Sequence, residues 1–266
     1  MTKKKIGLAL GGGGARGFCH IGVLQVLQEH NIPIHVVTGC SMGALVGGGF
    51  AAGISAETMM EVATSTSNHT VFDLDYLRML RLRPGEGGLA KGERAMTLYK
   101  KYVGEKLIEE CDIKFAAIAS DLVSKKLHVF KTGPIWQAVR ASMSIPGLFH
   151  PVRIDNKILV DGGVMKRIPI EEAYKLGANF VIAVDAIGPP VDIEEDANSM
   201  FKIIEISYQV LDWKAAQHEV KSADILITPK MGAKSAFKFK NSEESIQAGR
   251  DAAIAALPQI FKMLGM

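Results

Sequence analysis

Residues 39–43 read Gly-Cys-Ser-Met-Gly, and the segments on either side of them indicate an abrupt change from strand to helix. Residues 34–37, Ile-His-Val-Val, are mostly β-branched and are typical of a short buried strand. Residues 44–52 are small and apolar, which predicts a buried helix that ends at Gly53. A serine between two glycines at such a junction fits a nucleophile elbow, in which the serine has a strained backbone and its hydroxyl stands above the sheet edge.

The elbow would give Ser41 the position of a nucleophile. The N-terminus of the following helix would place the positive end of its dipole beneath a developing oxyanion. A five-residue match also occurs by chance in ordinary loops, so the motif alone leaves a loop without chemistry as an equal alternative.

Length and composition limit the class of protein. The chain has 266 residues, of which 48% are hydrophobic and 22% charged, so it can bury the core of one large α/β domain. The net charge of +3 is too small to indicate nucleic-acid binding. Cys19, Cys40 and Cys111 are widely spaced and form no Cys-x-x-Cys pair, so we expect reduced thiols, a cytoplasmic location and no metal cluster.

Two segments resemble targeting or membrane signals. Residues 3–10 begin with three lysines, but the apolar run that follows is too short for a signal peptide. Residues 36–56 carry no charge and are long enough to span a bilayer, although six of them are glycine. We therefore favour a buried helix packed on a sheet, with a transmembrane segment as the alternative.

Strand-like and helix-like segments alternate along most of the chain. Strands are expected at 5–10, 34–38, 115–119, 127–130, 158–160, 180–184 and 225–228, and helices at 18–28, 44–52, 55–63, 91–102, 135–142, 170–176, 199–221 and after Asn241. This alternation predicts an α/β fold with a mostly parallel sheet covered on both faces. The sequence contains no repeat and no long linker, so we expect a single domain over residues 1–266.

Residues 64–92 interrupt the alternation. Within them, residues 71–83 place arginines at 78, 81 and 83 among leucine, methionine and tyrosine. This composition suits a lid or insertion that contacts anionic lipid headgroups, and so a candidate surface for peripheral membrane contact. A helix packed on the body with a solvated basic face fits equally well.

Residues 12–17 match G-x-G-x-x-G between a strand and a helix, which is the setting of a dinucleotide site. Such a site also needs an acidic residue near the end of the second strand, but residues 31–42 contain neither Asp nor Glu. The consecutive glycines suit an oxyanion hole better, because their amides can converge on one point. If the first and second strands are neighbours in the sheet, the glycine loop and the elbow that follow them lie at the same sheet edge.

A nucleophilic serine needs a base. None of the seven histidines lies in a supporting motif, and His218 is the one that follows Asp161, so a histidine-dependent esterase stays an alternative. Asp161 ends an apolar strand and precedes Gly162 and Gly163. A partly desolvated carboxylate can act as a base, although Asp-Gly-Gly alone also describes an ordinary turn.

Taken together, the glycine loop 12–17, the elbow 39–43, Asp161-Gly162-Gly163 and the segment 141–149 resemble the signatures of patatin-like phospholipases of the bacterial single-domain type. The resemblance implies a three-layer α/β/α fold, a Ser–Asp dyad without histidine, and hydrolysis of acyl esters of lipids. It makes Ser41 the nucleophile and Asp161 the base.

The same resemblance assigns the remaining site residues. The amides of Gly12, Gly13 and Gly14 would form the oxyanion hole, and the supporting residues would be Arg16, Gly39, Gly43, Gly162 and Gly163. It implies an acyl-ester lipid as substrate and neither cofactor nor metal. The alternative is a catalytically idle regulatory or lipid-binding protein on the same scaffold.

Overall fold

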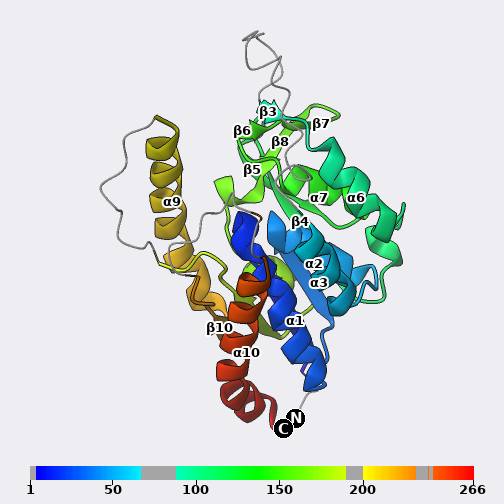
Figure 1. Cartoon of the computed structure of the whole chain (residues 1–266), viewed down its shortest axis with the longest axis vertical. Coiled ribbons are helices and arrows are strands. Elements are labelled where there is room, and N and C mark those ends of the chain that lie inside the picture. The colour runs from blue at the N-terminus through cyan, green and yellow to red at the C-terminus, as the bar shows by residue number, and fades with distance from the viewer. Residues whose placement is uncertain (1–3, 67–87, 190–199, 232–238, 240–241) are drawn as a thin grey trace.

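The structure is a computed structural model that describes residues 4–66, 88–189, 200–231, 239 and 242–266 (Figure 1). In these residues eight strands form one sheet in the order β10-β9-β1-β2-β4-β8-β7, with β5 paired to β4. The strands are β1 (Ile6–Leu10), β2 (Val36–Cys40), β4 (Lys114–Asp121), β5 (Lys126–Phe130), β7 (Val152–Ile154), β8 (Lys157–Asp161), β9 (Phe180–Val184) and β10 (Ile225–Ile227). A separate pair joins β3 (Gly88–Ala90) to β6 (Gly147–Phe149).

The sheet is parallel from β10 to β4 and antiparallel beyond it. β9 pairs parallel with both β10 and β1, and β2 pairs parallel with both β1 and β4. β5 and β8 run antiparallel to β4, and β7 runs antiparallel to β8. The predicted mostly parallel sheet is therefore confirmed, with an antiparallel part at one end.

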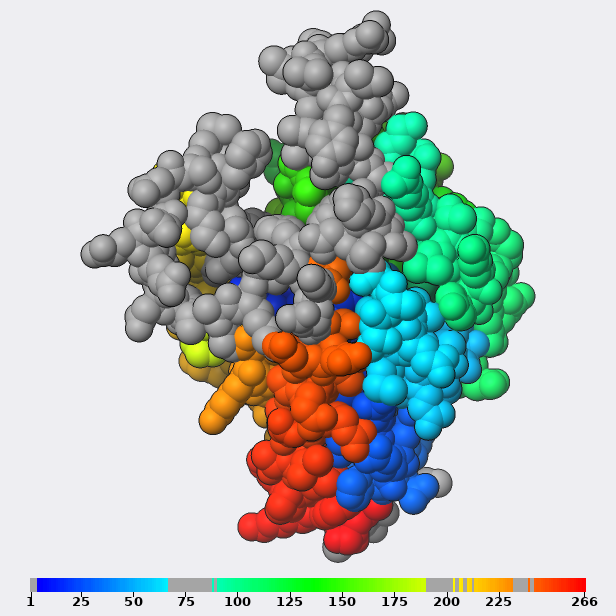
Figure 2. All heavy atoms as spheres, viewed as in Figure 1, coloured from blue at the N-terminus to red at the C-terminus, as the bar shows by residue number. Residues whose placement is uncertain are grey.

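Helices cover both faces of the sheet. They are α1 (Cys19–Glu29), α2 (Met42–Ala51), α3 (Ala56–Ser65), α6 (Glu93–Val103), α7 (Ile135–Ser142), α8 (Ile170–Lys175), α9 (Met200–Glu219) and α10 (Ser242–Leu264), with 3-10 turns η1 (Gly14–Phe18), η2 (Ile108–Glu110), η3 (Gly162–Val164) and η4 (Val220–Ser222). α10 packs against α1 and α3, and Figure 2 shows α10, in orange to red, on the face turned toward the viewer.

The two faces of the sheet bury separate cores. Because side chains alternate along a strand, Leu8 and Leu10 join the large core beneath α1, α2 and α10, whereas Ala9 joins a small core beneath α8. The same alternation sends Ile182 of β9 to the large core and Val181 to the small one. The chain thus has the expected three-layer α/β/α architecture.

Most predicted elements agree with the structure. The helix at 135–142 and the strand at 180–184 have the predicted bounds, and the pair at 115–119 and 127–130 is the antiparallel ladder of β4 and β5. The helix after the elbow begins at Met42 rather than at Ala44, because Ser41 itself is its N-cap. The short strands β3, β6 and β7 were not predicted, since three residues carry no readable alternation.

The membrane alternative for residues 36–56 is wrong. That stretch is divided between β2 and α2, and α2 has 10 residues, which at 1.5 Å per residue cover about half of a hydrocarbon core. No helix in the described part of the chain combines the length and apolarity that crossing a bilayer requires. The candidate lid at 71–83 lies outside the described residues, as does most of 64–92.

Candidate active site

The turn between β2 and α2 has the geometry of a nucleophile elbow. Ser41 has φ 53° and ψ −121°, a conformation that costs a non-glycine residue energy and persists only when the surroundings enforce it. A Cβ on Gly39 would lie 2.5 Å from the Cα of Ala44, and one on Gly43 would lie 2.2 Å from the carbonyl oxygen of Leu10. Both flanking positions therefore need glycine, as the motif predicts.

The glycine loop lies beside the elbow. β1 and β2 are neighbours, with Leu10 opposite Gly39, so the loops that follow them open at the same sheet edge as predicted. A Cβ on Gly12 would lie 3.5 Å from the Cβ of Ser41, which places the loop in contact with the serine.

The amides of the glycine loop are not equivalent. The Gly12 N–H donates to the carbonyl of Arg167 at 3.1 Å, so this amide is engaged within the protein. Among the described residues, no backbone carbonyl accepts from the N–H of Gly13 or Gly14. These two amides are therefore better placed than that of Gly12 to serve a ligand.

The sheet brings Asp161 to the elbow. β5 occupies one edge of β4 over residues 117–121, so β2 and β8 must share the other edge. On that edge Cys40 pairs with Ile118 and Asp161 pairs with the next residue, Ala119. The strands run in opposite directions, and their C-terminal ends therefore meet head to head where Ser41 leaves β2.

Hydrogen bonds fix the orientation of Asp161 at this junction. Its Oδ1 accepts from the N–H of Gly163 at 2.8 Å and from the thiol of Cys40 at 3.8 Å. Gly162 packs so closely that a Cβ there would lie 2.7 Å from the carbonyl oxygen of Ile118. The two glycines predicted to support Asp161 thus have separate roles: Gly163 donates a hydrogen bond to its carboxylate, and Gly162 lets the chain pack closely against β4.

The last residue of α7 and the segment that follows it hold both candidate catalytic residues. The N–H of Ser41 donates to the Oγ of Ser142 at 2.8 Å, and the N–H of Asp161 donates to the carbonyl of Ser144 at 2.9 Å. Ser41 is 6% exposed and Asp161 is 4% exposed. Electrostatic interactions between them are accordingly stronger than at the protein surface.

Sequence reasoning missed three buried residues around the glycine loop. His20 is fully buried, and its Nε2 lies 2.8 Å from the carbonyl oxygen of Gly11. Arg167, whose carbonyl holds the Gly12 amide, forms a buried ion pair with Asp185 at 2.8 Å. An aspartate directly after the β9 strand was a readable signal, whereas His20 and Arg167 are marked by no pattern in the sequence.

The positions of His20 and His218 argue against either of them as the base. Burial lowers the pKa of His20 to about 4, and this ring is engaged with Gly11. His218 is exposed on α9, whereas Ser41 is buried.

Arg16, the predicted supporting residue of the glycine loop, is buried in η1.

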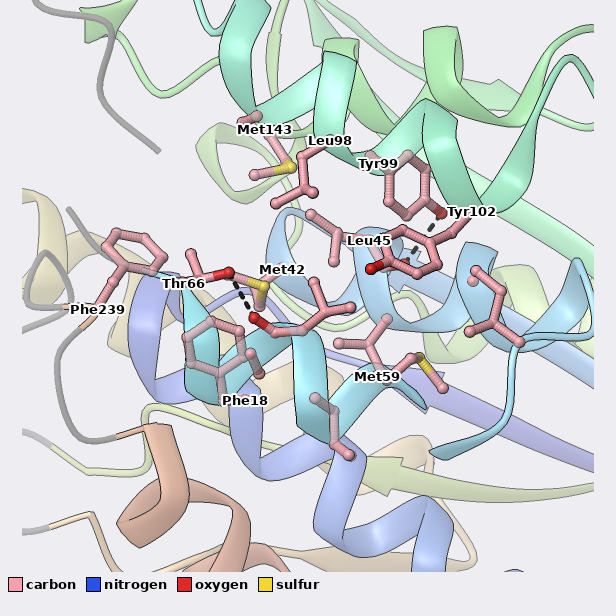
Figure 3. A pocket seen from close by; sticks show the side chains of 17 residues that line it. Phe18, Met42, Leu45, Met59, Thr66, Leu98, Tyr99, Tyr102, Met143 and Phe239 are labelled. Atoms are coloured by element: carbon pink, nitrogen blue, oxygen red, sulfur yellow. Dashed lines mark hydrogen bonds between the residues drawn. The ribbon is translucent and has the colours of Figure 1, made fainter. Parts of the chain in front are cut away.

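A cavity of about 770 Å³, including the space open to solvent, begins beside the elbow (Figure 3). Its walls come mainly from α2, α3 and α6 and are almost entirely apolar: Phe18, Ile21, Met42, Leu45, Val46, Gly49, Ile54, Met59, Val62, Ala63, Thr66, Ala95, Leu98, Tyr99, Tyr102, Met143 and Phe239. Two of the polar groups are satisfied internally, since the Tyr99 hydroxyl donates to Leu45 at 3.1 Å and that of Thr66 to Val62 at 2.6 Å. The cavity thus suits an apolar chain.

The family model of patatin-like phospholipases matches residues 8–174, which include the glycine loop, the elbow and Asp161. This chain belongs to the patatin-like phospholipase family. The match begins within β1 and ends within α8, so it contains every predicted site residue.

Curated patatin-like relatives are longer than this chain. It is 36% identical over 196 residues to an uncharacterized NTE family protein of Mycobacterium tuberculosis, covering 74% of this chain and 53% of that protein. It is 37% identical over 185 residues to Lysophospholipase NTE1 of Cryptococcus neoformans, covering 68% of this chain and 11% of that protein. The chain therefore spans about half or less of the length of these relatives.

Solved structures share the patatin-like fold at low identity. Human GIVD cytosolic phospholipase A2 superposes with a TM-score of 0.57 at 11% identity, over 98% of this chain and 60% of that one. VipD from Legionella pneumophila gives a TM-score of 0.54 at 15% identity, over 97% of this chain and 67% of that one. These likenesses establish the fold.

Proposed function

We propose that this protein is a serine acyl hydrolase of the lipase, phospholipase or lysophospholipase type, which cleaves fatty-acyl esters. The observation that carries the proposal is the head-to-head meeting of β2 and β8 on one edge of β4, which brings Ser41 and Asp161 together beside the glycine loop. Membership of the family and the similarity to Lysophospholipase NTE1 support a lipid substrate.

In the proposed reaction, Asp161 accepts the proton of the Ser41 hydroxyl while Oγ attacks the ester carbonyl carbon. The carbonyl oxygen becomes an oxyanion, which the amides of Gly13 and Gly14 and the N-terminal end of α2 stabilise. The proton then passes to the departing alcohol as the ester C–O bond breaks. Water attacks the acyl-enzyme with Asp161 again as the base, which releases the fatty acid and restores Ser41.

The cavity supports a fatty-acyl group as the part of the substrate that is bound. Met42 lines it directly after the nucleophile, and Met143 lines it directly after Ser142, which holds the Ser41 amide. Burial of an acyl chain against these apolar walls contributes about 0.8 kcal/mol per methylene. The alcohol part of the substrate would lie outside this cavity, at the opening of the glycine loop.

Hydrolysis of p-nitrophenyl octanoate and of lysophosphatidylcholine tests the proposal. Ser41→Ala and Asp161→Asn each remove one member of the dyad, so each should lower kcat by about 10³-fold or more. His218→Ala should retain the wild-type rate. Full activity in Ser41→Ala would overturn the proposal, and loss of activity in His218→Ala alone would support the histidine-dependent alternative.

A further inference from the structure

Three consecutive glycines, Gly47, Gly48 and Gly49, lie inside α2, where each glycine costs about 1 kcal/mol relative to alanine. Packing accounts for the first two. A Cβ on Gly47 would lie 2.8 Å from Val37, and one on Gly48 would lie 2.8 Å from the Tyr99 hydroxyl and 3.0 Å from Ile135. Both glycines allow α2 to approach its neighbours closely.

Gly49 has no such explanation. A Cβ there would lie 3.4 Å from the Sδ of Met59 and 3.5 Å from the Cδ1 of Ile54, which are ordinary van der Waals distances, and its φ is not in the left-handed region. Both of these neighbours line the apolar cavity, as Gly49 itself does. The missing side chain therefore relieves no clash, and it leaves methyl-sized space at the cavity wall.

Gly49 lies on the face of α2 that lines the cavity, far along the helix from the candidate nucleophile. The helix presents Met42, Leu45, Val46 and Gly49 to the cavity, at the spacing of one helical face. Met42 follows the nucleophile, and Gly49 lies seven residues farther on, or about 10 Å along the helix axis. In Figure 3 Phe18, Met42 and Phe239 lie toward one end of the cavity, and Met59, Tyr99 and Tyr102 lie toward the other.

We propose that Gly49 is a specificity-determining residue that sets how long an acyl chain the cavity accepts. The inference rests on the proposed function, because it assumes that the acyl chain enters the cavity from Ser41. A short chain ends before it reaches Gly49, whereas a long chain runs along the part of the cavity wall that Gly49, Ile54 and Met59 form. A larger residue at position 49 extends into this part of the cavity and selects short acyl groups.

The kinetic test compares p-nitrophenyl palmitate with p-nitrophenyl butanoate in wild type, Gly49→Ala and Gly49→Leu. The readout is the palmitate-to-butanoate ratio of kcat/KM. Each methylene that is expelled from the cavity lowers this ratio about fourfold, so displacement of two or three by leucine predicts a fall of roughly fifteen- to sixtyfold. Gly49→Ala should lower it about fourfold, and this variant guards against a folding defect in Gly49→Leu.

Two further variants serve as controls. One enlarges the cavity and should have the opposite effect, and the other adds a leucine outside the cavity. Ile54→Ala enlarges the cavity beside Gly49 and should raise the ratio. Thr64→Leu adds a leucine to the exposed side of α3, at a position that does not line the cavity, and should leave the ratio unchanged. An unchanged ratio in both Gly49 variants overturns the inference, as does a fall of the same size in Thr64→Leu.

A binding measurement separates failure of the inference from failure of the proposed function. In the Ser41→Ala background, displacement of cis-parinaric acid by free palmitate and by butanoate reports the cavity without turnover. Adding Gly49→Leu should weaken palmitate binding by the same roughly fifteen- to sixtyfold. If no ester is hydrolysed by the wild type but this shift is seen, hydrolysis is wrong and the role of Gly49 stands; if hydrolysis occurs without the shift, the role of Gly49 alone is wrong.

Discussion

Three hydrogen bonds hold the start of the glycine loop, two made by the preceding residue Gly11 and one by Gly12. Gly11 donates to Val184 at 3.0 Å, Gly12 donates to Arg167 at 3.1 Å, and the carbonyl of Gly11 accepts from His20 at 2.8 Å. A loop fixed in this way presents the following amides in a set orientation, which is what an oxyanion hole requires. Removal of one such donor in a hydrolase typically costs about 10²–10³ in kcat.

His20 should make stability depend on pH. A carbonyl can only accept, so the proton lies on Nε2, and the buried Nδ1 has no partner among the described residues. The folded pKa of about 4 lies below the ordinary 6.5, so between these values the unfolded chain binds a proton that the folded chain does not. The neutral His20 ring therefore does not reduce the free energy of unfolding above pH 6.5. As the pH falls from 6.5 toward 4, the free energy of unfolding decreases by up to about 1.4 kcal/mol per pH unit.

Urea denaturation of wild type and His20→Gln across this range measures the effect. Glutamine can donate to the Gly11 carbonyl but does not titrate, so the variant should lose less stability on acidification than the wild type. Equal pH slopes in the two proteins would show that His20 does not carry this dependence.

At the level of elements, α2 connects the candidate nucleophile to the apolar cavity. Its N-terminus carries Ser41, one face lines the cavity, and its glycines permit contact with the sheet. Sequence reasoning could predict this helix because its small residues are contiguous. It could not separate the roles of its glycines, since each role depends on a neighbour from elsewhere in the chain, such as Leu10 for Gly43 or Ile54 for Gly49.

Alanine substitutions at two glycines of α2 should have opposite effects on stability. A Cβ on Gly43 would lie 2.2 Å from the backbone oxygen of Leu10, so Gly43→Ala must move the helix away from β1 and should lose about 1–3 kcal/mol. Gly49→Ala finds ordinary contact distances and should gain about 0.5–1 kcal/mol from helix propensity. Urea unfolding measures both, and equal stability of the two variants would contradict the packing described for α2.

Across the whole molecule, the site depends on strand order. Cys40 and Asp161 are 121 positions apart, and they meet because β2 and β8 share one edge of β4. Local patterns predicted that Asp161 ends a strand, and the neighbouring β1 and β2 were predicted to bring the glycine loop to the elbow. The pairing of β8 with β4 is a long-range contact that no local pattern encodes, and only the family resemblance linked Asp161 to Ser41.

The buried pair of Arg167 and Asp185 was beyond prediction for the same reason. Arg167 follows β8 and Asp185 follows β9, and these strands lie on opposite sides of β1, β2 and β4 in the sheet. Their contact at 2.8 Å depends on the route that the chain takes past the glycine loop. Sequence analysis can identify the ends of such strands, but their meeting follows from the three-dimensional path between them.

Labelling with a fluorophosphonate probe, followed by peptide mass spectrometry, tests most directly whether Ser41 is a nucleophile activated by Asp161. The probe forms a covalent bond to an activated serine whether or not the natural lipid is known. We expect one labelled residue, Ser41, with no labelling in Ser41→Ala and labelling at least about tenfold slower in Asp161→Asn. Labelling at a different serine, or no labelling of the folded wild-type protein, would contradict the account and favour a catalytically idle lipid-binding protein.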